Sequence, residues 1–308
     1  MPPGERAWSG DFSDVPALHR RCSASQARWP MENYSPELIK AVGHGAGPGY
    51  AQYYFCEDLF YPEDVFLASY PRSGSHFVRF LIATALELRD TEKLPQSLAA
   101  MARVPDVHAT DLRGGTPGPR IIKTHFPWDP RYRRVVHLIR DPRDVAASYY
   151  WYSRRKPQLF FERLSAFPSP ADFAERFLGG GVWPSDPRRH TESYATAPSS
   201  TACMRVRYED LLRAPSREVG RLLRFLGIEI ARPALEQVIA HASFSNMARL
   251  FDEQAVRSGH LPPLRDDVVR KGRVGAYRDD LPASVVAALE AKLGVELARY
   301  GYSEVLSG

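Results

Sequence analysis

One short stretch, "FLASYPRSGSHFVRFLIATAL" at residues 66–86, constrains the fold more than any other part of the chain. It predicts a strand at residues 65–69, then a loop of small residues, then a segment with helical spacing. A helix that begins after such a loop presents backbone N–H groups and its positive dipole end to an anion. The nucleoside-triphosphate signature G-x-x-x-x-G-K-[ST] does not occur in the sequence. The stretch therefore predicts an anion site of another kind.

Strands and helices alternate along much of the chain. Further short apolar runs, typical of strands covered on both faces, lie at residues 120–124, 134–139 and 203–208. Helices are predicted at residues 75–88, 143–153 and 215–226. This alternation indicates one α/β domain with a central parallel sheet flanked by helices. We expect residues 1–60 to form an irregular arm packed on the domain at residues 61–308. Residues 154–200 are expected to form an excursion with one helix, at residues 171–178.

The composition places the chain among ordinary globular proteins, with 44% hydrophobic and 25% charged residues. No apolar run approaches the roughly 18–20 residues that cross a bilayer, and the N-terminus lacks a secretory signal. We therefore expect a cytoplasmic protein with no membrane partner. The net charge of +5 suits an anionic ligand. No dense basic stripe or nucleic-acid module accompanies it, so we expect no nucleic-acid partner.

The three cysteines, Cys22, Cys56 and Cys203, lie far apart in the sequence. Their spacing fits neither a disulfide framework nor a metal site. We predict buried free thiols and no bound metal.

Lys123 and His125 lie where the second predicted strand ends and a loop begins. Residues two apart in a strand point to the same face, and ligands of open parallel sheets bind beyond the carboxyl ends of the strands. Such a pair can supply an acid–base group and a positive charge for a developing anion. The alternative is that His125 is a hydrogen-bonded histidine and Lys123 a surface charge.

The third predicted strand ends at Arg140, and Asp141 and Pro142 then mark the start of a helix. Ser148 lies about two turns into this helix, so Arg140 and Ser148 can converge on one phosphate. His137, in the middle of the strand, is predicted to be a core histidine.

Two further charged segments have weaker signals. Arg143 and Asp144 follow the helix start and fit a solvated helix face as well as a site. Arg270, Lys271 and Gly272 resemble a basic loop whose glycine lets the backbone close over an anion.

Together and in this order, these segments resemble the motifs of the cytosolic-type sulfotransferases. Those enzymes transfer a sulfuryl group from 3′-phosphoadenosine 5′-phosphosulfate (PAPS) to an acceptor. The family motif Y-P-K-S-G-[ST]-[NT]-W corresponds to "YPRSGSHF" at residues 70–77, and K-T-H-x-P to "KTHFP" at residues 123–127. The motif R-[ND]-P-[KR]-D-V-A-x-S-[YF]-[YF] corresponds to residues 140–150. Shorter matches are Y-E-D at residues 208–210, S-F-x-x-M at 243–247 and R-K-G at 270–272.

The resemblance implies a P-loop-NTPase-like sulfotransferase fold, PAPS as co-substrate and no metal requirement. The residues that it implies around the 5′-phosphosulfate are Arg72, Ser73, Gly74 and Ser75, with His76 in the same loop. Those implied at the 3′-phosphate are Arg140, Ser148, Arg270, Lys271 and Gly272, and those at the adenine are Phe77, Tyr208 and Phe244. His125 is implied as the general base, and Lys123 and Arg72 as the charges that neutralise the leaving oxygen.

The chain departs from the family pattern at several positions. Arg72 replaces a lysine, which keeps the charge and adds a bidentate fork but cannot donate a proton near neutrality. Phe77 and Tyr277 stand where tryptophan is common, and Ala242 where a threonine often contacts the nucleotide. The dimer motif K-x-x-x-T-V-x-x-x-E does not follow the basic loop, so we make no prediction of the oligomeric state.

Aromatic residues of the arm and the excursion can line an apolar acceptor pocket, and the protein core is the alternative for many of them. These residues are Tyr53, Tyr54, Phe55, Phe160, Phe161, Phe173, Phe177 and Trp183. They favour a small hydrophobic alcohol or phenol as acceptor. Two alternatives are a P-loop-type nucleotide kinase, whose Lys-Ser/Thr pair the loop lacks, and a non-catalytic nucleotide- or anion-binding protein, which leaves Lys123 and His125 without a role.

Overall fold

Four parallel strands form the centre of the protein. The computed structural model describes residues 59–110, 112, 119–155, 167–257 and 271–303. Within them lie β1 (Val65–Ser69), β2 (Ile121–Thr124), β3 (Arg134–Ile139) and β4 (Ala202–Arg207), in the order β2-β1-β3-β4. Leu67 pairs with Lys123 on one side and with Val136 on the other. Because all pairs are parallel, the carboxyl ends of the strands meet at one edge of the sheet.

The continuous apolar character of β1 follows from packing on both faces. Val65 and Leu67 belong to one core, which contains apolar residues of the helices α4 (Ser75–Thr91), α9 (Pro215–Phe225) and α10 (Arg232–His241). Phe66 and Ala68 belong to another, which also contains Tyr194 of helix α7 (Pro187–Ala195). All five residues of β1 are buried. A strand buried on both faces needs apolar residues at successive positions rather than at alternate ones.

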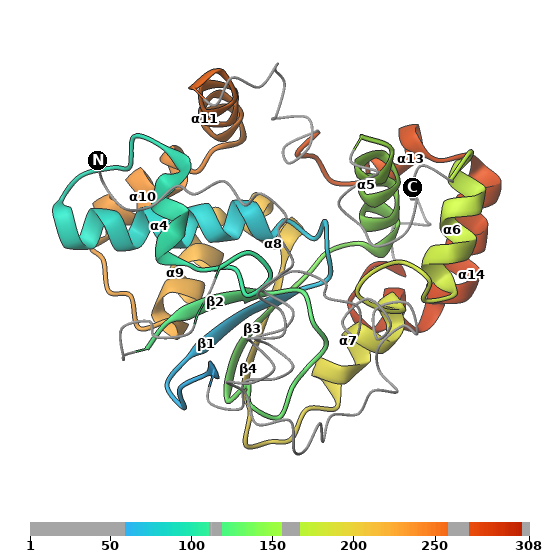
Figure 1. The fold of residues 1–308 in the computed structure, drawn as a ribbon, viewed down its shortest axis with the longest axis horizontal. Coiled ribbons are helices and arrows are strands. Elements are labelled where there is room, and N and C mark those ends of the chain that lie inside the picture. The colour runs from blue at the N-terminus through green and yellow to red at the C-terminus, as the bar shows by residue number, and fades with distance from the viewer. Residues whose placement is uncertain (1–58, 111, 113–118, 156–166, 258–270, 304–308) are drawn as a thin grey trace, which may run out of the picture.

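Helices surround the sheet in two groups (Figure 1). The first group consists of α4 (Ser75–Thr91), the short 3₁₀ helix η4 (Leu98–Arg103), α9 (Pro215–Phe225), α10 (Arg232–His241) and α11 (Phe244–Arg257). On the other side lie α5 (Pro142–Arg155), α6 (Pro170–Leu178), α7 (Pro187–Ala195), α13 (Tyr277–Asp280) and α14 (Ala283–Arg299). The short helix α8 (Tyr208–Arg213) follows β4 directly. The α/β fold with a central parallel sheet is thus confirmed.

The predicted elements are present, with ends shifted by no more than three residues. Tyr208 begins α8 instead of ending β4. The described part of the excursion, residues 167–200, contains two helices, α6 and α7, where one was predicted. The side chain of Asp186 accepts a hydrogen bond from the N–H of Arg188, and Pro187 is the first residue of α7, so a standard N-cap starts the missed helix.

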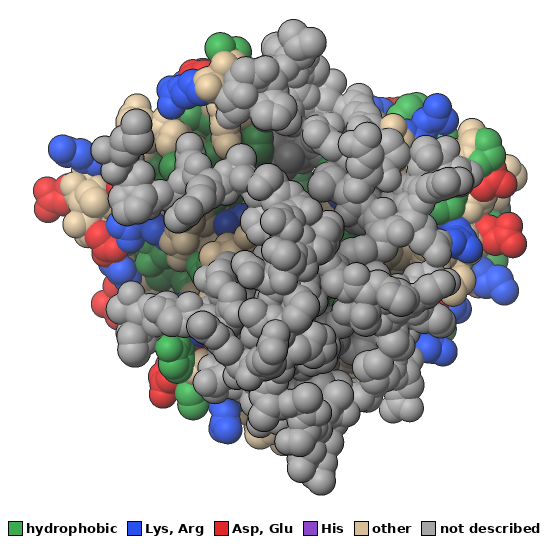
Figure 2. Space-filling model, viewed as in Figure 1, with side chains coloured by type: hydrophobic (Ala, Val, Ile, Leu, Met, Phe, Trp, Pro, Cys, Tyr) green, Lys and Arg blue, Asp and Glu red, His purple; other side chains and the backbone are tan. Residues whose placement is uncertain are grey.

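Some predictions concern residues that the structure does not describe or places differently. Cys203 is exposed, so the prediction of a buried thiol is wrong for it, while Cys22 and Cys56 lie outside the described residues. The predicted N-terminal arm also lies outside them, apart from its last two residues. On the face shown in Figure 2, basic and acidic side chains of the described part are intermingled along the outline.

Candidate active site

The loop between β1 and α4 has a backbone that few sequences tolerate. Arg72 and Gly74 both adopt left-handed conformations, with φ of 70° and 98°. A Cβ atom at Gly74 would lie 2.5 Å from the ring of Tyr208, so glycine is required by both conformation and space. Ser73 and Ser75 are buried. The loop closes tightly around the N-terminus of the 17-residue helix α4, where unpaired N–H groups favour an anion.

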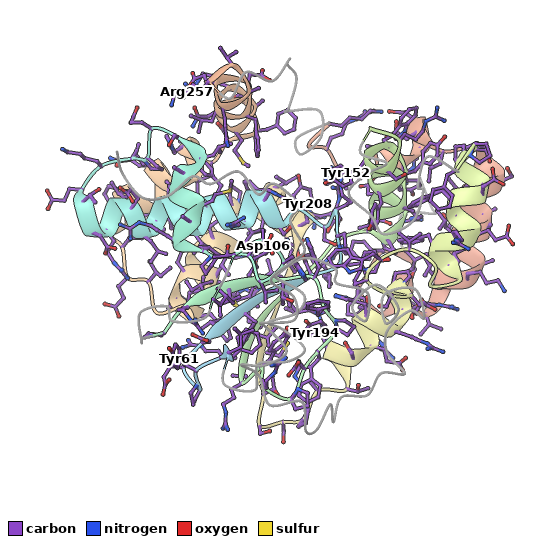
Figure 3. The ribbon with its side chains drawn as sticks, in the orientation of Figure 1. Tyr61, Asp106, Tyr152, Tyr194, Tyr208 and Arg257 are labelled. Carbon is purple, nitrogen blue, oxygen red and sulfur yellow. The ribbon has the colours of Figure 1, made fainter. Side chains whose placement is uncertain are left out.

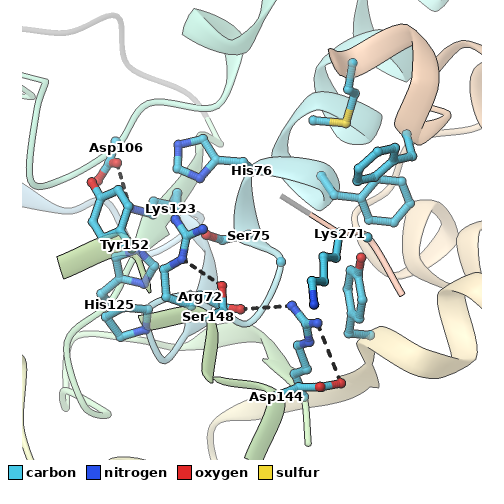
Figure 4. A pocket seen from close by; sticks show the side chains of 18 of the residues that line it. Arg72, Ser75, His76, Asp106, Lys123, His125, Asp144, Ser148, Tyr152 and Lys271 are labelled. Carbon is cyan, nitrogen blue, oxygen red and sulfur yellow. Dashed lines mark hydrogen bonds and ion pairs between the residues drawn. The ribbon is translucent and has the colours of Figure 1, made fainter. Parts of the chain in front are cut away.

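A cavity of about 400 Å³ opens at the carboxyl edge of the sheet, next to this loop. The strands β1, β2, β3 and β4 are followed by Tyr70, His125, Arg140 and Tyr208, and the last three of these line the cavity. The other predicted site residues that line it are Arg72, Gly74, Ser75, His76, Phe77, Lys123, Ser148, Phe244, Lys271 and Gly272. Figure 4 shows part of this set around the open space. Ser73 borders a smaller neighbouring cavity, and Arg270 lies outside the described residues.

His125 is held in one tautomer by a backbone contact. Its Nδ1 lies 2.8 Å from the carbonyl oxygen of Ser69. A carbonyl only accepts, so Nδ1 carries the proton and Nε2 keeps its lone pair. Burial, followed by the nearby Lys123 and His108, holds the pKa of His125 well below its usual value of 6.5. The imidazole is therefore neutral at pH 7, as a general base must be.

Lys123 is buried and ion-paired. Its Nζ lies 2.7 Å from Oδ2 of Asp106, and only 5% of the lysine side chain is exposed. The alternative of a surface charge is therefore wrong. Burial lowers the pKa of Lys123, and the carboxylate of Asp106 opposes this decrease. Lys123 is thus a cation held at the cavity wall within reach of His125.

Arg72 extends from the loop toward helix α5. Its Nε donates to Oγ of Ser148 at 3.2 Å, and its guanidinium lies over the ring of Tyr152 at 4.4 Å from the centroid. These contacts fix the guanidinium of Arg72 at the cavity wall.

Arg140 lies between an aromatic ring and a carboxylate. Its guanidinium lies 4.6 Å from the centroid of Tyr208, and its Nη2 lies 3.6 Å from Oδ2 of Asp144. Asp144 in turn accepts backbone hydrogen bonds from Gly275 and Tyr277, at 2.8 and 2.9 Å. A buried carboxylate therefore ties Arg140 to the segment that follows the basic loop.

Asp144 and Arg143 do not form the solvated helix face that was the alternative for them. Both are buried. Arg143 pairs with Asp141 at 2.7 Å and with Glu290 of α14 at 2.7 Å. It anchors α5 in the protein and does not line the cavity.

The described part of the basic loop packs on an aromatic ring. Gly272 has a φ of 61°, and any Cβ there would overlap the ring of Phe244. Lys271 extends its Nζ to 2.7 Å from Oδ1 of Asp280. Across the cavity, the rings of Phe77 and Tyr208 meet edge to face with centroids 6.1 Å apart. The structure thus brings the three predicted adenine residues and two of the three basic-loop residues to one cavity.

The other histidines and aromatics divide between cavity and core. His76 lines the cavity, where burial and the cations Lys123, Arg79 and Arg72 lower its pKa to about 3. His137 is buried in the core, as predicted. Trp183 lines the cavity. Phe173 and Phe177 instead pack in the core between α5, α6 and α14, so the core alternative is correct for these two residues. Tyr53, Tyr54, Phe55, Phe160 and Phe161 lie outside the described residues.

Some residues that line the cavity were not predicted from the sequence. Asp106, His108 and Tyr152 are among them, and Asp106 and Tyr152 are labelled in Figure 3. Tyr152 follows the third motif by two positions and had only its aromatic character as a signal. Asp106 and His108 belong to no motif and reach the site through tertiary contact alone.

The sulfotransferase domain model matches residues 62–301, which is most of the chain. The chain therefore belongs to the sulfotransferase domain family, and the enzyme class predicted from its motifs is confirmed. Sulfotransferase 1B1 of Canis lupus familiaris is 27% identical over 240 residues, covering 71% of this chain and 78% of the relative. Sulfotransferase 1E1 of Rattus norvegicus is 26% identical over 285 residues, with 83% and 92% covered.

Solved structures support the same fold. Mouse sulfotransferase SULT7A1 complexed with PAP aligns with a TM-score of 0.59 and 21% identity over 87% of this chain and 91% of that one. Retinol dehydratase in complex with androsterone and inactive cofactor PAP aligns with a TM-score of 0.61 and 21% identity, over 85% and 94%.

Membrane-spanning helices and metal-binding clusters are both absent from the described residues. No described helix is long and apolar enough to span a bilayer. In the same residues, no group of three or more His, Cys, Asp or Glu side chains is arranged to hold a metal ion.

Proposed function

We propose that this protein transfers the sulfuryl group of PAPS to a hydroxyl of a small, hydrophobic alcohol or phenol, with His125 as general base. The observation that carries the proposal is the state of His125. It is neutral, has its Nδ1 bound to the Ser69 carbonyl, and lines the same cavity as Lys123 and the anion loop. The structurally similar retinol dehydratase was crystallised with androsterone and with retinol, which supports a hydrophobic acceptor.

The donor would be held by the three groups of residues that line the cavity. The loop from Arg72 to Ser75, with the N-terminus of α4, suits the 5′-phosphosulfate. Arg140, Ser148 and the basic loop suit the 3′-phosphate, since arginine binds phosphate with two parallel hydrogen bonds. The rings of Phe77, Tyr208 and Phe244 offer faces for the adenine.

The reaction would proceed by in-line displacement. Nε2 of His125 takes the proton of the acceptor hydroxyl, whose oxygen attacks the sulfur. The bond between sulfur and the bridging oxygen breaks, and its electron pair leaves with the 5′-phosphate. Lys123 and Arg72 neutralise the charge on that oxygen, and the products are the sulfate ester and adenosine 3′,5′-bisphosphate. Positioning and charge stabilisation carry most of the catalysis in transfers of this kind.

Calorimetric titration tests the donor site. We expect adenosine 3′,5′-bisphosphate to bind without Mg²⁺ and much more tightly than adenosine 5′-monophosphate, because the 3′-phosphate has its own cations. Titrations with ATP, with and without Mg²⁺, complete the set. A preference for ATP with Mg²⁺ would contradict the proposal and favour the kinase alternative.

Replacing Arg140 by alanine should weaken adenosine 3′,5′-bisphosphate binding by about 10- to 100-fold, because charge-assisted hydrogen bonds contribute about 1.5–3 kcal/mol. The affinity for adenosine 5′-monophosphate should stay nearly unchanged, and calorimetry measures both. Arg221→Ala is the control, since it removes a half-exposed arginine that does not line the cavity. Equal losses of affinity for the two nucleotides in Arg140→Ala would refute the assignment to the 3′-phosphate.

A further inference from the structure

The short segment at residues 105–108 belongs to none of the family motifs and lies against the end of β2. The backbone N–H of Lys123 donates to the carbonyl of Pro105 at 2.8 Å, and the N–H of Val107 donates to the carbonyl of Lys123 at 3.0 Å. Asp106 and Lys123 thereby form an isolated parallel bridge. The segment is therefore hydrogen-bonded to the backbone of Lys123, which forms the proposed catalytic pair with His125.

The carboxylate of Asp106 uses both oxygens in this arrangement. Oδ2 lies 2.7 Å from Nζ of Lys123, and Oδ1 accepts the backbone N–H of His108 at 3.0 Å. The side chains of Lys123 and Asp106 are 5% and 12% exposed, so little water competes for either charge. Figure 4 shows the pair at the wall of the cavity. The carboxylate therefore fixes where the ammonium of Lys123 lies.

His108 holds the neighbouring catalytic residue by its backbone. Its Nε2 accepts the N–H of His125 at 2.8 Å, and the two imidazole rings stack with centroids 5.6 Å apart. Burial, together with Lys123, lowers the pKa of His108 to about 3 against the opposing effect of Asp106. A neutral imidazole is required here, because a protonated ring has no acceptor nitrogen to offer.

We infer that Asp106 and His108 are positioning residues for sulfuryl transfer, Asp106 through the ammonium of Lys123 and His108 through the backbone of His125. This inference rests on the proposed function for its catalytic consequence and on the contacts above for its structural part. Neither residue is needed to cradle the donor. Their effect should therefore appear in turnover and in its pH dependence more than in nucleotide affinity.

The electrostatic part of the inference can be given a direction. Charged and titratable groups from three parts of the chain interact with Lys123. They are Asp106 and His108 in residues 105–108, Arg79 and His76 in α4, and His125 after β2. Asp106 is the carboxylate of this group, and it opposes the lowering of the Lys123 pKa by burial and Arg79. Without that carboxylate the pKa of Lys123 falls further, so its charge is lost at a lower pH.

The first test compares Asp106→Asn with Asp106→Glu and Asp64→Asn. With PAPS and 2-naphthol as a probe phenol, Asp106→Asn should lower kcat by about 10- to 100-fold. The alkaline limb of its kcat–pH profile should move to lower pH, and Asp106→Glu should restore that limb. Asp64 is a buried carboxylate paired with Arg120 at the opposite end of the sheet, so Asp64→Asn should leave the limb in place. Adenosine 3′,5′-bisphosphate affinity reports whether each variant is folded.

The second test concerns His108. Glutamine retains an acceptor oxygen for the N–H of His125, whereas phenylalanine retains only the ring. We expect His108→Gln to keep much more of the wild-type kcat than His108→Phe, at similar nucleotide affinity. Equal kcat values for the two variants would overturn the positioning role of His108.

A readout without turnover decides the role of Asp106 independently. The chain has six lysines, so ¹³C NMR of labelled lysine side chains can resolve Lys123 and follow its titration. Asp106→Asn should lower the Lys123 pKa, and Asp64→Asn should not. An unchanged Lys123 titration in Asp106→Asn would overturn the inference. A wild-type protein that binds no adenosine 3′,5′-bisphosphate would overturn the proposed function instead, and the NMR result would still decide the contact.

Discussion

His125→Ala is expected to lower kcat for sulfuryl transfer by about 10²- to 10⁴-fold, the usual contribution of a positioned general base. The affinity for adenosine 3′,5′-bisphosphate should change little, because His125 faces the acceptor proton and not the nucleotide phosphates. The physical basis is the single tautomer set by the Ser69 carbonyl and the neutral state set by burial. Steady-state kinetics with PAPS and calorimetry with the product nucleotide measure the two quantities separately.

Two controls separate base catalysis from damage to the site. His125→Gln preserves polarity and approximate size but has no nitrogen basic enough to take the proton, so it should be as slow as the alanine variant. Added imidazole should enter the space left in His125→Ala and restore part of the rate. A normal kcat in either variant would remove His125 as the base.

The free energy of unfolding is expected to fall steeply as the pH is lowered below about 6.5, the ordinary pKa of histidine. Burial lowers the pKa of all six histidines that the structure describes, to about 3 for His76, His108 and His190. The other three are His125, His137 and His241. Below pH 6.5 the unfolded chain binds protons that the folded protein does not, so stability decreases with falling pH. Six such groups give a slope of at most about 8 kcal/mol per pH unit.

Urea unfolding at several pH values between about 7.5 and 5 measures this slope. The window ends where carboxylates begin to contribute. His137→Leu is the informative variant, because His137 lies in β3 away from the main cavity and stacks on Tyr194 with centroids 4.3 Å apart. It should reduce the slope by at most about 1.4 kcal/mol per pH unit, since one of six titrating groups is removed. A stability that is flat over this range would show that these imidazoles titrate normally in the folded state.

The cations of the candidate site are stabilised by neighbouring carboxylates. Lys123, Arg140 and Lys271 each have an acidic neighbour, respectively Asp106, Asp144 and Asp280. Cations crowded around one cavity repel one another, and each carboxylate reduces that repulsion. A polyanionic donor would enter a site whose cations are already oriented, which lowers the reorganisation needed on binding.

Local features of the sequence were enough to predict much of the fold. The run from Val65 to Ala68 is apolar at successive positions because the strand is covered on both faces, and its prediction as a buried parallel strand is correct. The same holds for the start of α5 at Pro142, where proline at the first helical position is a local signal. The order of the motifs was sufficient to predict the family, which the domain match confirms.

Sequence patterns failed where a side chain had two environments open to it. Phe173 and Phe177 are apolar in either setting, and only the packing of α6 against α5 and α14 places them in the core. Arg143 and Asp144 have charges typical of a surface, yet both are buried because each finds partners on the C-terminal segment. Their burial depends on residues more than 100 positions away, which no local pattern reports.

What the sequence by itself determined is the four strands, several of the helices and the motifs, because strand and helix periodicity, the anion loop and the helix starts depend on neighbouring residues. Only the tertiary structure placed Asp106 and His108 beside Lys123 and His125. Their segment reaches β2 through backbone pairing across 17 residues, and pairing of that kind depends on how the intervening chain packs. The protonation states follow in the same way, because burial and the approach of charges from separate elements set the pKa values of the cavity residues.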